Sequence, residues 1–222
     1  MEVPAFSQAG APDLVARMRA HLPAKLGVWA GLAIGICVPY FALQHVGGPA
    51  LRVLTATFVD RAIPFAPAWI HVYVSLGLLV PLAPLLAGSR AELTRYAVGL
   101  ALLCIPCFLI FLAVPVLGPR PEAAAGPELY ALIVLVDRPS NSLPSLHAGL
   151  TLYSLLFLHR ILDHTLSPAG RRAMTVVGGA WGALILYSTL ATKQHWAVDL
   201  PAGMLIAWAA HRLAWRGDAA RR

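Results

Sequence analysis

Long apolar runs fill most of the chain, and they decide what it can fold into. A helix needs about 20 apolar residues to cross the hydrocarbon core of a bilayer, at a rise of about 1.5 Å per residue. Six segments come close to this length or exceed it: residues 26–46, 63–87, 96–117, 144–162, 173–190 and 196–214. Only 12% of the residues are charged, about half the share found in soluble domains. The sequence therefore predicts an all-α membrane protein with six transmembrane helices.

The basic residues predict the orientation of these spans. With the N-terminus in the cytosol, twelve of the 17 Lys and Arg residues lie inside and five outside, which satisfies the positive-inside rule. The five on the outside are Arg52, Arg61, Arg120, Arg138 and Lys193. We therefore expect an N-in/C-in protein of an inner (plasma) membrane of the bacterial type.

One membrane domain, residues 26–215, is expected between a cytosolic N-terminal tail, residues 1–25, and a basic cytosolic tail, residues 216–222. The net charge of +7 is spread over short loops, which indicates topology and attraction to lipid headgroups rather than binding of nucleic acid. We predict that Cys104 and Cys107, spaced like a redox pair, are packing residues, because both lie in an apolar run.

Two long segments lie on the expected outer side. Residues 48–62 are expected to form a short interfacial helix that contains Arg52 and Arg61. Residues 118–143 have an apolar middle, which is expected to lie at the membrane interface. Long ordered loops are usually functional, so we expect these segments to border a site.

His195 and Asp199 form the first candidate pair for chemistry. They are four residues apart, so on a helix that starts near residue 195 they share one face. The carboxylate can then accept a hydrogen bond from Nδ1–H, which leaves Nε2 free for nucleophilic attack. An ionisable pair in a membrane helix indicates function. The alternative is a pair that only ties helices together.

A second motif, Pro144-Ser145-Leu146-His147, begins the fourth predicted span on the same outer side. Ser142 or Ser145 is expected to cap this helix, and the free N–H groups of its first turn favour a bound phosphate. His147 and His195 would then meet at one membrane face as an acid/base and nucleophile set. The alternative for His147 is an ordinary interfacial histidine.

Three of the basic residues on the outer side stand next to these motifs. Lys193, Arg120 and Arg138 supply the positive charge that a transferring phosphoryl group requires. Each can instead face lipid headgroups, and Arg120 and Arg138 compete for one clamp role. Although His and Asp four residues apart can hold a metal, three nearby cations disfavour it, so we predict neither metal nor cofactor.

The paired motifs resemble signatures of a known family. The type 2 phosphatidic acid phosphatase (PAP2) superfamily has a second and a third signature that are similar to two stretches of this chain. The second resembles Pro144-Ser145-Leu146-His147, and the third resembles Ser188-Thr189-Leu190-Ala191-Thr192-Lys193-Gln194-His195-Trp196-Ala197-Val198-Asp199. The serine–leucine–histidine form resembles the branch of inositol-phosphorylceramide-synthase-like proteins. The resemblance covers about residues 118–205.

The resemblance implies a role for each motif residue. His195 would attack phosphorus and become phosphohistidine, Asp199 would orient it, and His147 would protonate the leaving oxygen and then activate the acceptor. Ser145 would bind the phosphate, and Thr189 stands where the third signature usually carries Arg.

The first signature, Lys-x6-Arg-Pro, is only partly present. Arg120-Pro121 and Arg138-Pro139 both match its end, but positions 113 and 131 are Ala instead of Lys. Lys193 is a candidate to replace the lost charge. These departures suggest a rebuilt phosphate clamp and a substrate that differs from that of the standard phosphatases.

Our leading functional hypothesis is a metal-independent lipid phosphatase that hydrolyses a lipid phosphate or diphosphate through phosphohistidine. Two alternatives stay open: a phosphotransferase that moves a phospho-headgroup to a second lipid alcohol, and a non-catalytic lipid-binding or transport protein. The expected partners are a lipid phosphate and the bilayer. The sequence does not determine the lipid or the oligomeric state.

Overall fold

The computed structural model describes residues 14–45, 50–121, 126–163 and 165–216. This part of the chain is mostly helical. Its main helices are α1 (Leu14–Arg19), α2 (Leu22–Leu32), the π-helical η1 (Ala33–Cys37), α3 (Val38–Leu43), α5 (Ile70–Val74), α6 (Leu76–Leu85), α7 (Arg90–Ala113), α9 (Leu146–Leu162), α10 (Pro168–Ala191) and α11 (Asp199–Ala214). Residues 14–25, which the sequence places in the N-terminal tail, form α1 and the first turn of α2.

Three of the long helices begin with the same local device. Ser89, Ser145 and Ser167 precede α7, α9 and α10, and each serine hydroxyl accepts a hydrogen bond from the main-chain N–H three residues later. A serine at this position satisfies a donor that the helix itself leaves unpaired. The N-cap that the sequence predicted for the fourth span is therefore confirmed at Ser145, and the helix begins at Leu146.

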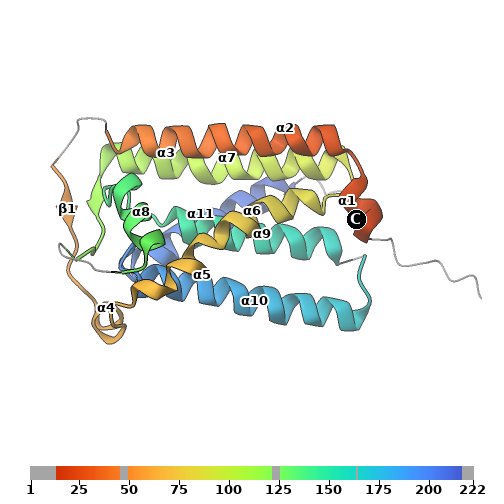
Figure 1. The fold of residues 1–222 in the computed structure, drawn as a ribbon. Coiled ribbons are helices and arrows are strands. Elements are labelled where there is room, and N and C mark those ends of the chain that lie inside the picture. Colours follow the sequence, from red (N-terminus) through yellow and green to blue (C-terminus); the bar gives the residue numbers. More distant parts are fainter. Residues whose placement is uncertain (1–13, 46–49, 122–125, 164, 217–222) are drawn as a thin grey trace, which may run out of the picture.

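The long helices lie side by side in one bundle (Figure 1). Helix α9 packs against α6, α7, α10 and α11, and α2 lies on α7. Tyr153 and Phe157 on α9 are completely buried. Cys104 and Cys107 on α7 are free thiols buried in the same apolar cluster. The packing role predicted for these two cysteines is confirmed.

Four helical segments are long and apolar enough to cross a membrane: Leu22–Leu43, Pro67–Leu85, Arg90–Ala113 and Pro168–Ala191. They coincide with four of the six predicted spans. Helices α9, with 17 residues, and α11, with 16 residues, match the other two in position but are shorter. The chain is thus a multi-pass membrane protein, and six spans and their orientation stay predictions.

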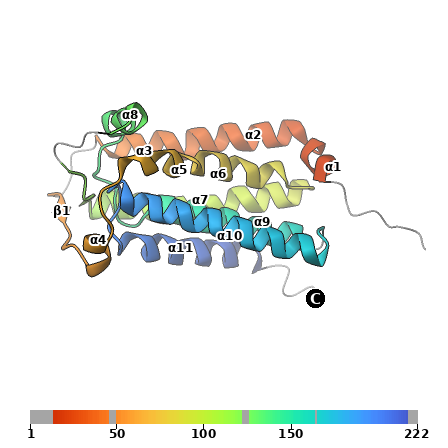
Figure 2. The same cartoon turned by 60° about the horizontal axis from the view of Figure 1, so that its bottom comes forward.

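Short elements gather at one end of the bundle, opposite α1 (Figures 1 and 2). They are η2 (Pro67–Trp69), α4 (Phe58–Ala62), α8 (Glu128–Val136) and the strands β1 (Arg52–Val53) and β2 (Val116–Leu117), which pair in parallel. The interfacial helix expected to contain Arg52 and Arg61 holds only Arg61, because Thr57 and Asp60 form a capping box that starts α4 at Phe58. Arg52 instead belongs to β1.

Candidate functional site

The turn before α11 holds the first motif, at the end of the bundle that carries α4 and α8. The helix expected to start near His195 starts at Asp199, so the expectation of one shared helical face was wrong. Instead, the Asp199 carboxylate accepts a hydrogen bond of 2.8 Å from the Trp196 main-chain N–H. This contact closes the turn and brings the carboxylate back to His195.

The His195 ring is held through one nitrogen. Its Nδ1 lies 3.0 Å from the Ser142 carbonyl oxygen and 3.4 Å from Oδ2 of Asp199. The Ser142 hydroxyl donates to the same Oδ2. With two acceptors facing Nδ1, the proton belongs there, and Nε2 keeps its lone pair. Both side chains are buried, with Asp199 fully inaccessible to solvent.

His147 lies in the first turn of α9 and faces His195. The two ring centroids are 6.2 Å apart. On its other side the His147 ring stacks on Tyr73 of α5, with centroids 3.9 Å apart and planes at 18°. The structure thus brings together the two histidines that the sequence singled out. Tyr73 was missed, and no spacing in the sequence links it to either motif.

Ser145 joins the two motifs through its main chain. Its hydroxyl accepts from the Ala148 N–H at 3.2 Å as the N-cap of α9, and its own N–H donates to the Asp199 carbonyl oxygen at 3.0 Å. A Cβ at position 203 of α11 would overlap the Ser145 carbonyl oxygen, so Gly203 is what lets the two helices approach. The Ser145 side chain is fully buried.

Arg120 and Arg138 have different surroundings. Arg120 forms a buried ion pair with Asp137 at 3.0 Å and also donates to the Asp137 carbonyl oxygen and to Gln194, the residue before His195. Arg138 is exposed, and its main-chain N–H donates to the side-chain oxygen of Gln44 at 2.9 Å. Both arginines line a small polar cavity with His195. Arg120 is held inside this cavity, and Arg138 stands at its rim.

Asp137 connects this cavity to the first predicted span. Its carboxylate accepts hydrogen bonds from Tyr40 Oη at 3.0 Å and from Gln44 Nε2 at 2.6 Å, both on the segment that ends α3. It also faces Arg120. Sequence reasoning missed Asp137, Tyr40 and Gln44, because residues almost 100 positions apart meet only in the folded bundle.

Lys193 is directed away from this cavity. Its Nζ donates to the main-chain oxygens of Asp60 at 2.9 Å and Ile63 at 2.6 Å, at the end of α4. Burial lowers the pKa of this ammonium, and the Asp60 carboxylate opposes the shift. The phosphate-binding role predicted for Lys193 stays a prediction, and the structure shows a contact that ties the turn carrying His195 to α4.

Asp60 supports the same turn from the other side. Its Oδ1 accepts from the Ala197 N–H at 2.7 Å, while Oδ2 accepts from Thr57. Burial alone would raise the pKa of this carboxyl, but the hydrogen bonds from Thr57 and Ala197, together with Lys193, hold it below its ordinary value. The Thr57-x-x-Asp60 pattern signals a helix start, but nothing in the sequence predicted the contact with Ala197.

Thr189 lies at the end of α10 and is fully buried. Its hydroxyl donates to the Leu186 carbonyl oxygen at 2.8 Å, and its own carbonyl accepts from Gln194 at 2.9 Å and His195 at 3.3 Å. Thr189 therefore shapes the turn that carries the candidate nucleophile, and its predicted contact with phosphate stays a prediction. In the described ranges, no group of three or more His, Cys, Asp or Glu side chains gathers where a metal could bind.

These features define a class: a helical membrane protein with a paired-histidine site at one end of its bundle. A family model, the PAP2 superfamily, matches residues 70–222. The chain therefore belongs to the PAP2 superfamily of phosphatases, and a lipid phosphate is the substrate that this membership implies. The matched region begins at α5 and contains both histidine motifs. No curated protein and no solved structure matches the chain.

Proposed function

We propose that this protein is an integral membrane lipid phosphatase that hydrolyses a lipid phosphate or diphosphate through a phosphohistidine on His195. The observation that carries the proposal is the pair of facing histidine rings, 6.2 Å apart, of which one has its Nδ1 bound. A ring held by Nδ1 keeps Nε2 free as the nucleophilic atom. This is the arrangement that nucleophilic attack with an opposed acid requires.

The first step transfers the phosphoryl group to the enzyme. Nε2 of His195 forms a bond to phosphorus while the phosphorus–oxygen ester bond breaks. The positive charge that develops on the imidazole is stabilised by Asp199, 3.4 Å from Nδ1. His147 donates a proton to the leaving oxygen, so the lipid departs as a neutral alcohol.

The second step restores the enzyme. His147, now neutral, accepts a proton from a water molecule, and the resulting oxygen attacks phosphorus as the nitrogen–phosphorus bond breaks. Inorganic phosphate leaves, and His195 returns to its starting form. Stacking against Tyr73 holds the His147 ring in one plane for both proton transfers.

Arg120 is the cation that we assign to the transferring phosphate. Its guanidinium lies in the cavity with His195, where Asp137 and Gln194 fix its orientation. A preorganised donor of this kind stabilises charge that develops in the transition state. In the family signature a lysine stands seven residues before this arginine, and this chain has Ala113 there. Asp137, which pairs with Arg120, is itself held by hydrogen bonds from Tyr40 and Gln44.

The orientation that we propose places this site outside the cytosol. The end of the bundle with α4 and α8 carries the five basic residues that the sequence placed outside. The opposite end, with α1, the start of α7 and the end of α11, carries most of the other Lys and Arg residues. The positive-inside rule assigns the richer end to the cytosol. Orientation is tested in intact cells with an otherwise cysteine-free chain that carries a single cysteine at Glu128, an exposed position at the start of α8. A reagent added from outside should label this cysteine.

The function is tested with purified protein and four substrates: phosphatidic acid, phosphatidylglycerophosphate, and polyprenyl mono- and diphosphate. We expect release of inorganic phosphate from at least one of them in the presence of EDTA. Rapid quenching should recover labelled phosphate on His195. Transfer of the label to an added lipid alcohol, without free phosphate, would identify a phosphotransferase instead. Absence of both products would leave lipid binding as the function.

A further inference from the structure

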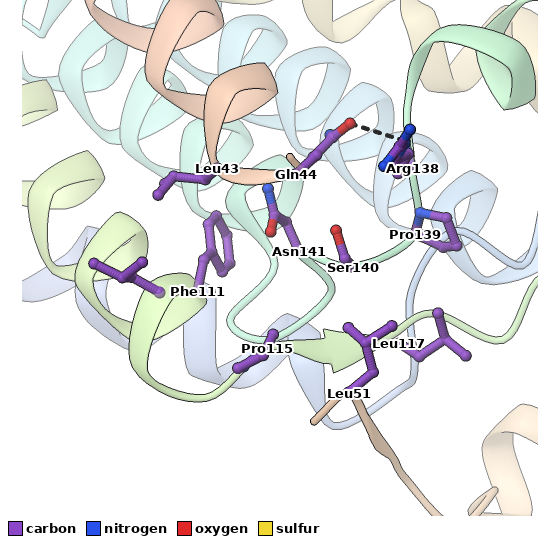
Figure 3. Close-up of a pocket in the computed structure, with 11 residues that line it drawn as sticks. Leu43, Gln44, Leu51, Phe111, Pro115, Leu117, Arg138, Pro139, Ser140 and Asn141 are labelled. Carbon is purple, nitrogen blue, oxygen red and sulfur yellow. Dashed lines mark hydrogen bonds between the residues drawn. The ribbon is translucent and has the colours of Figure 1, made fainter. Parts of the chain in front are cut away.

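A second pocket opens beside the catalytic cavity, between the end of α3, the end of α7 and the segment that follows α8 (Figure 3). Its volume is about 330 Å³, which is within the range of small-molecule sites. The lining side chains are Leu43, Gln44, Leu51, Phe111, Leu112, Pro115, Leu117, Arg138, Pro139, Ser140 and Asn141. We refer to it as the α3–α7 pocket.

The α3–α7 pocket has an apolar wall and a polar wall. The apolar wall consists of leucine, phenylalanine and proline side chains from α3, α7, β2 and the residues just before the two strands, together with Pro139 (Figure 3). On the polar wall, Gln44 and Asn141 are engaged by Asp137 and by the Tyr40 carbonyl oxygen. Arg138 and Ser140 differ, because their side chains have no hydrogen-bond partner within the described part of the chain.

This pocket adjoins the cavity of His195. Arg138, Pro139 and Asn141 line both spaces. A molecule whose phosphate lies beside His195 would therefore have this pocket next to it, on the far side of Arg138. The pocket is also open toward the surroundings of the bundle, because Leu51 and Leu112 at its edge are 52% and 46% exposed. Leu112 lies near the end of α7, one of the helices that are long and apolar enough to cross a membrane.

We propose that the α3–α7 pocket binds the hydrocarbon stem of the lipid phosphate next to its phosphate ester. The apolar wall contacts the first carbons of the chain, and Arg138 and Ser140 bind the oxygens that flank the transferred phosphate. An unpaired guanidinium and an unpaired hydroxyl beside a leucine-lined space match a lipid at the junction of its headgroup and its chain. This inference rests on the proposed function, and it assigns to Arg138 a task distinct from that of Arg120.

The first test compares two substrates and two variants. Leu112→Trp narrows the pocket, and Leu109→Trp places the same bulk one turn earlier on α7, at a side chain that is 61% exposed and does not line the pocket. We expect Leu112→Trp to raise the KM for long-chain phosphatidic acid about tenfold, the scale of a poorly fitting apolar group. Its kcat/KM for phenyl phosphate, which has no chain, should be unchanged.

The Leu109→Trp control should leave the kinetics of both substrates unchanged. Equal losses for phosphatidic acid and phenyl phosphate in Leu112→Trp would overturn the inference, because the pocket would then affect the chemistry rather than the chain. No change for either substrate would overturn it as well.

A second test needs no turnover and holds even if Leu112→Trp does not fold. The His195→Ala protein is incubated with phosphatidic acid that carries a photoactivatable group near the start of its acyl chain, and the attachment sites are mapped. We expect labelling within residues 111–117, and little from the matching phosphatidylcholine probe. Absence of this label, when the wild-type protein releases phosphate, refutes the pocket alone. Label there without phosphate release by the wild-type protein refutes only the phosphatase function.

Discussion

Two polar clusters at opposite ends of the bundle bury charge in different ways. At the end with α1, Lys25 is completely buried, and its Nζ donates to the carbonyl oxygens of Arg17, Met18 and Leu85 at 2.5, 3.2 and 2.7 Å. Arg17 in turn binds the Leu86 carbonyl oxygen and pairs with Glu92 at 2.8 Å. We call this cluster, formed by Arg17, Lys25 and Glu92, the N-terminal clasp.

In the cluster around His195, by comparison, some polar atoms lack hydrogen-bond partners among the described residues. Asp199 Oδ1, Gln194 Nε2 and Ser140 Oγ are buried, and none of them has a hydrogen-bond partner in the described ranges. Unpaired buried polar atoms are unfavourable and therefore uncommon in folded proteins. In the N-terminal clasp the charged groups bind carbonyl and carboxylate oxygens of neighbouring helices. The cluster around His195 instead keeps unpaired polar atoms, which a bound substrate would contact under the proposed function.

The largest effect is expected from His195→Ala. Removal of the nucleophile should lower phosphate release about 10⁵-fold, as loss of a catalytic nucleophile commonly does. Thermal unfolding should change little, because Asp199, the carboxylate beside the ring, keeps its hydrogen bonds from Ser142 and from the Trp196 N–H. The matched control is His45→Ala, an exposed histidine after α3 whose ring contacts only the Phe41 carbonyl oxygen. Full activity in the His195 variant would exclude the mechanism proposed here.

The next largest effect separates the two arginines. Arg120→Gln should lower kcat/KM by about 10²–10³-fold, because it removes a fixed cation from the cavity. Arg138→Gln should cost about tenfold, mostly in KM, because its guanidinium stands at the rim. Steady-state kinetics on one lipid phosphate measures both. The reverse order would show that Arg138 is the principal phosphate ligand.

Substitutions in the N-terminal clasp should lower the stability of the protein and leave its activity unchanged. Lys25→Met leaves three carbonyl oxygens without their donor, and we expect the free energy of unfolding to fall by about 3 kcal/mol. The kcat at low temperature should be that of the wild type. Leu26→Met, at the exposed neighbouring position, serves as the control. A loss of activity at unchanged Tm would contradict the division between the two ends.

The smallest expected effect concerns acid stability. Because the folded-state pKa of Asp60 lies below its ordinary value of 3.8, its carboxylate stabilises the fold above that pH, and this contribution disappears as the pH falls through the folded-state pKa. The decrease in Tm between about pH 6 and about pH 3 should therefore be smaller in Asp60→Asn than in the wild type. An equal or larger decrease in the variant would show that Asp60 does not contribute in this way.

Local patterns in the sequence were sufficient for much of the fold. The apolar runs placed the helices within a few residues, and Ser145 was correctly predicted as a cap, because a helix start depends on neighbouring residues. The packing role of Cys104 and Cys107 was also predicted correctly, from the apolar run that surrounds them. The start of α11 was misplaced, because the turn from His195 to Asp199 is closed by a side-chain contact that spacing alone does not reveal.

By itself, the sequence determined a helical membrane protein and the two histidine motifs on which the proposed chemistry depends, because apolar length and short spacings are local properties. Only the tertiary structure decided that Ser142 holds His195, that Tyr73 stacks on His147, and that Asp137 orients Arg120. The first two pairs come from distant segments and meet because separate parts of the bundle pack together. Arg120 and Asp137 are 17 positions apart and meet where the chain folds back around α8. The identity of such partners depends on the register of that packing, which no single segment encodes.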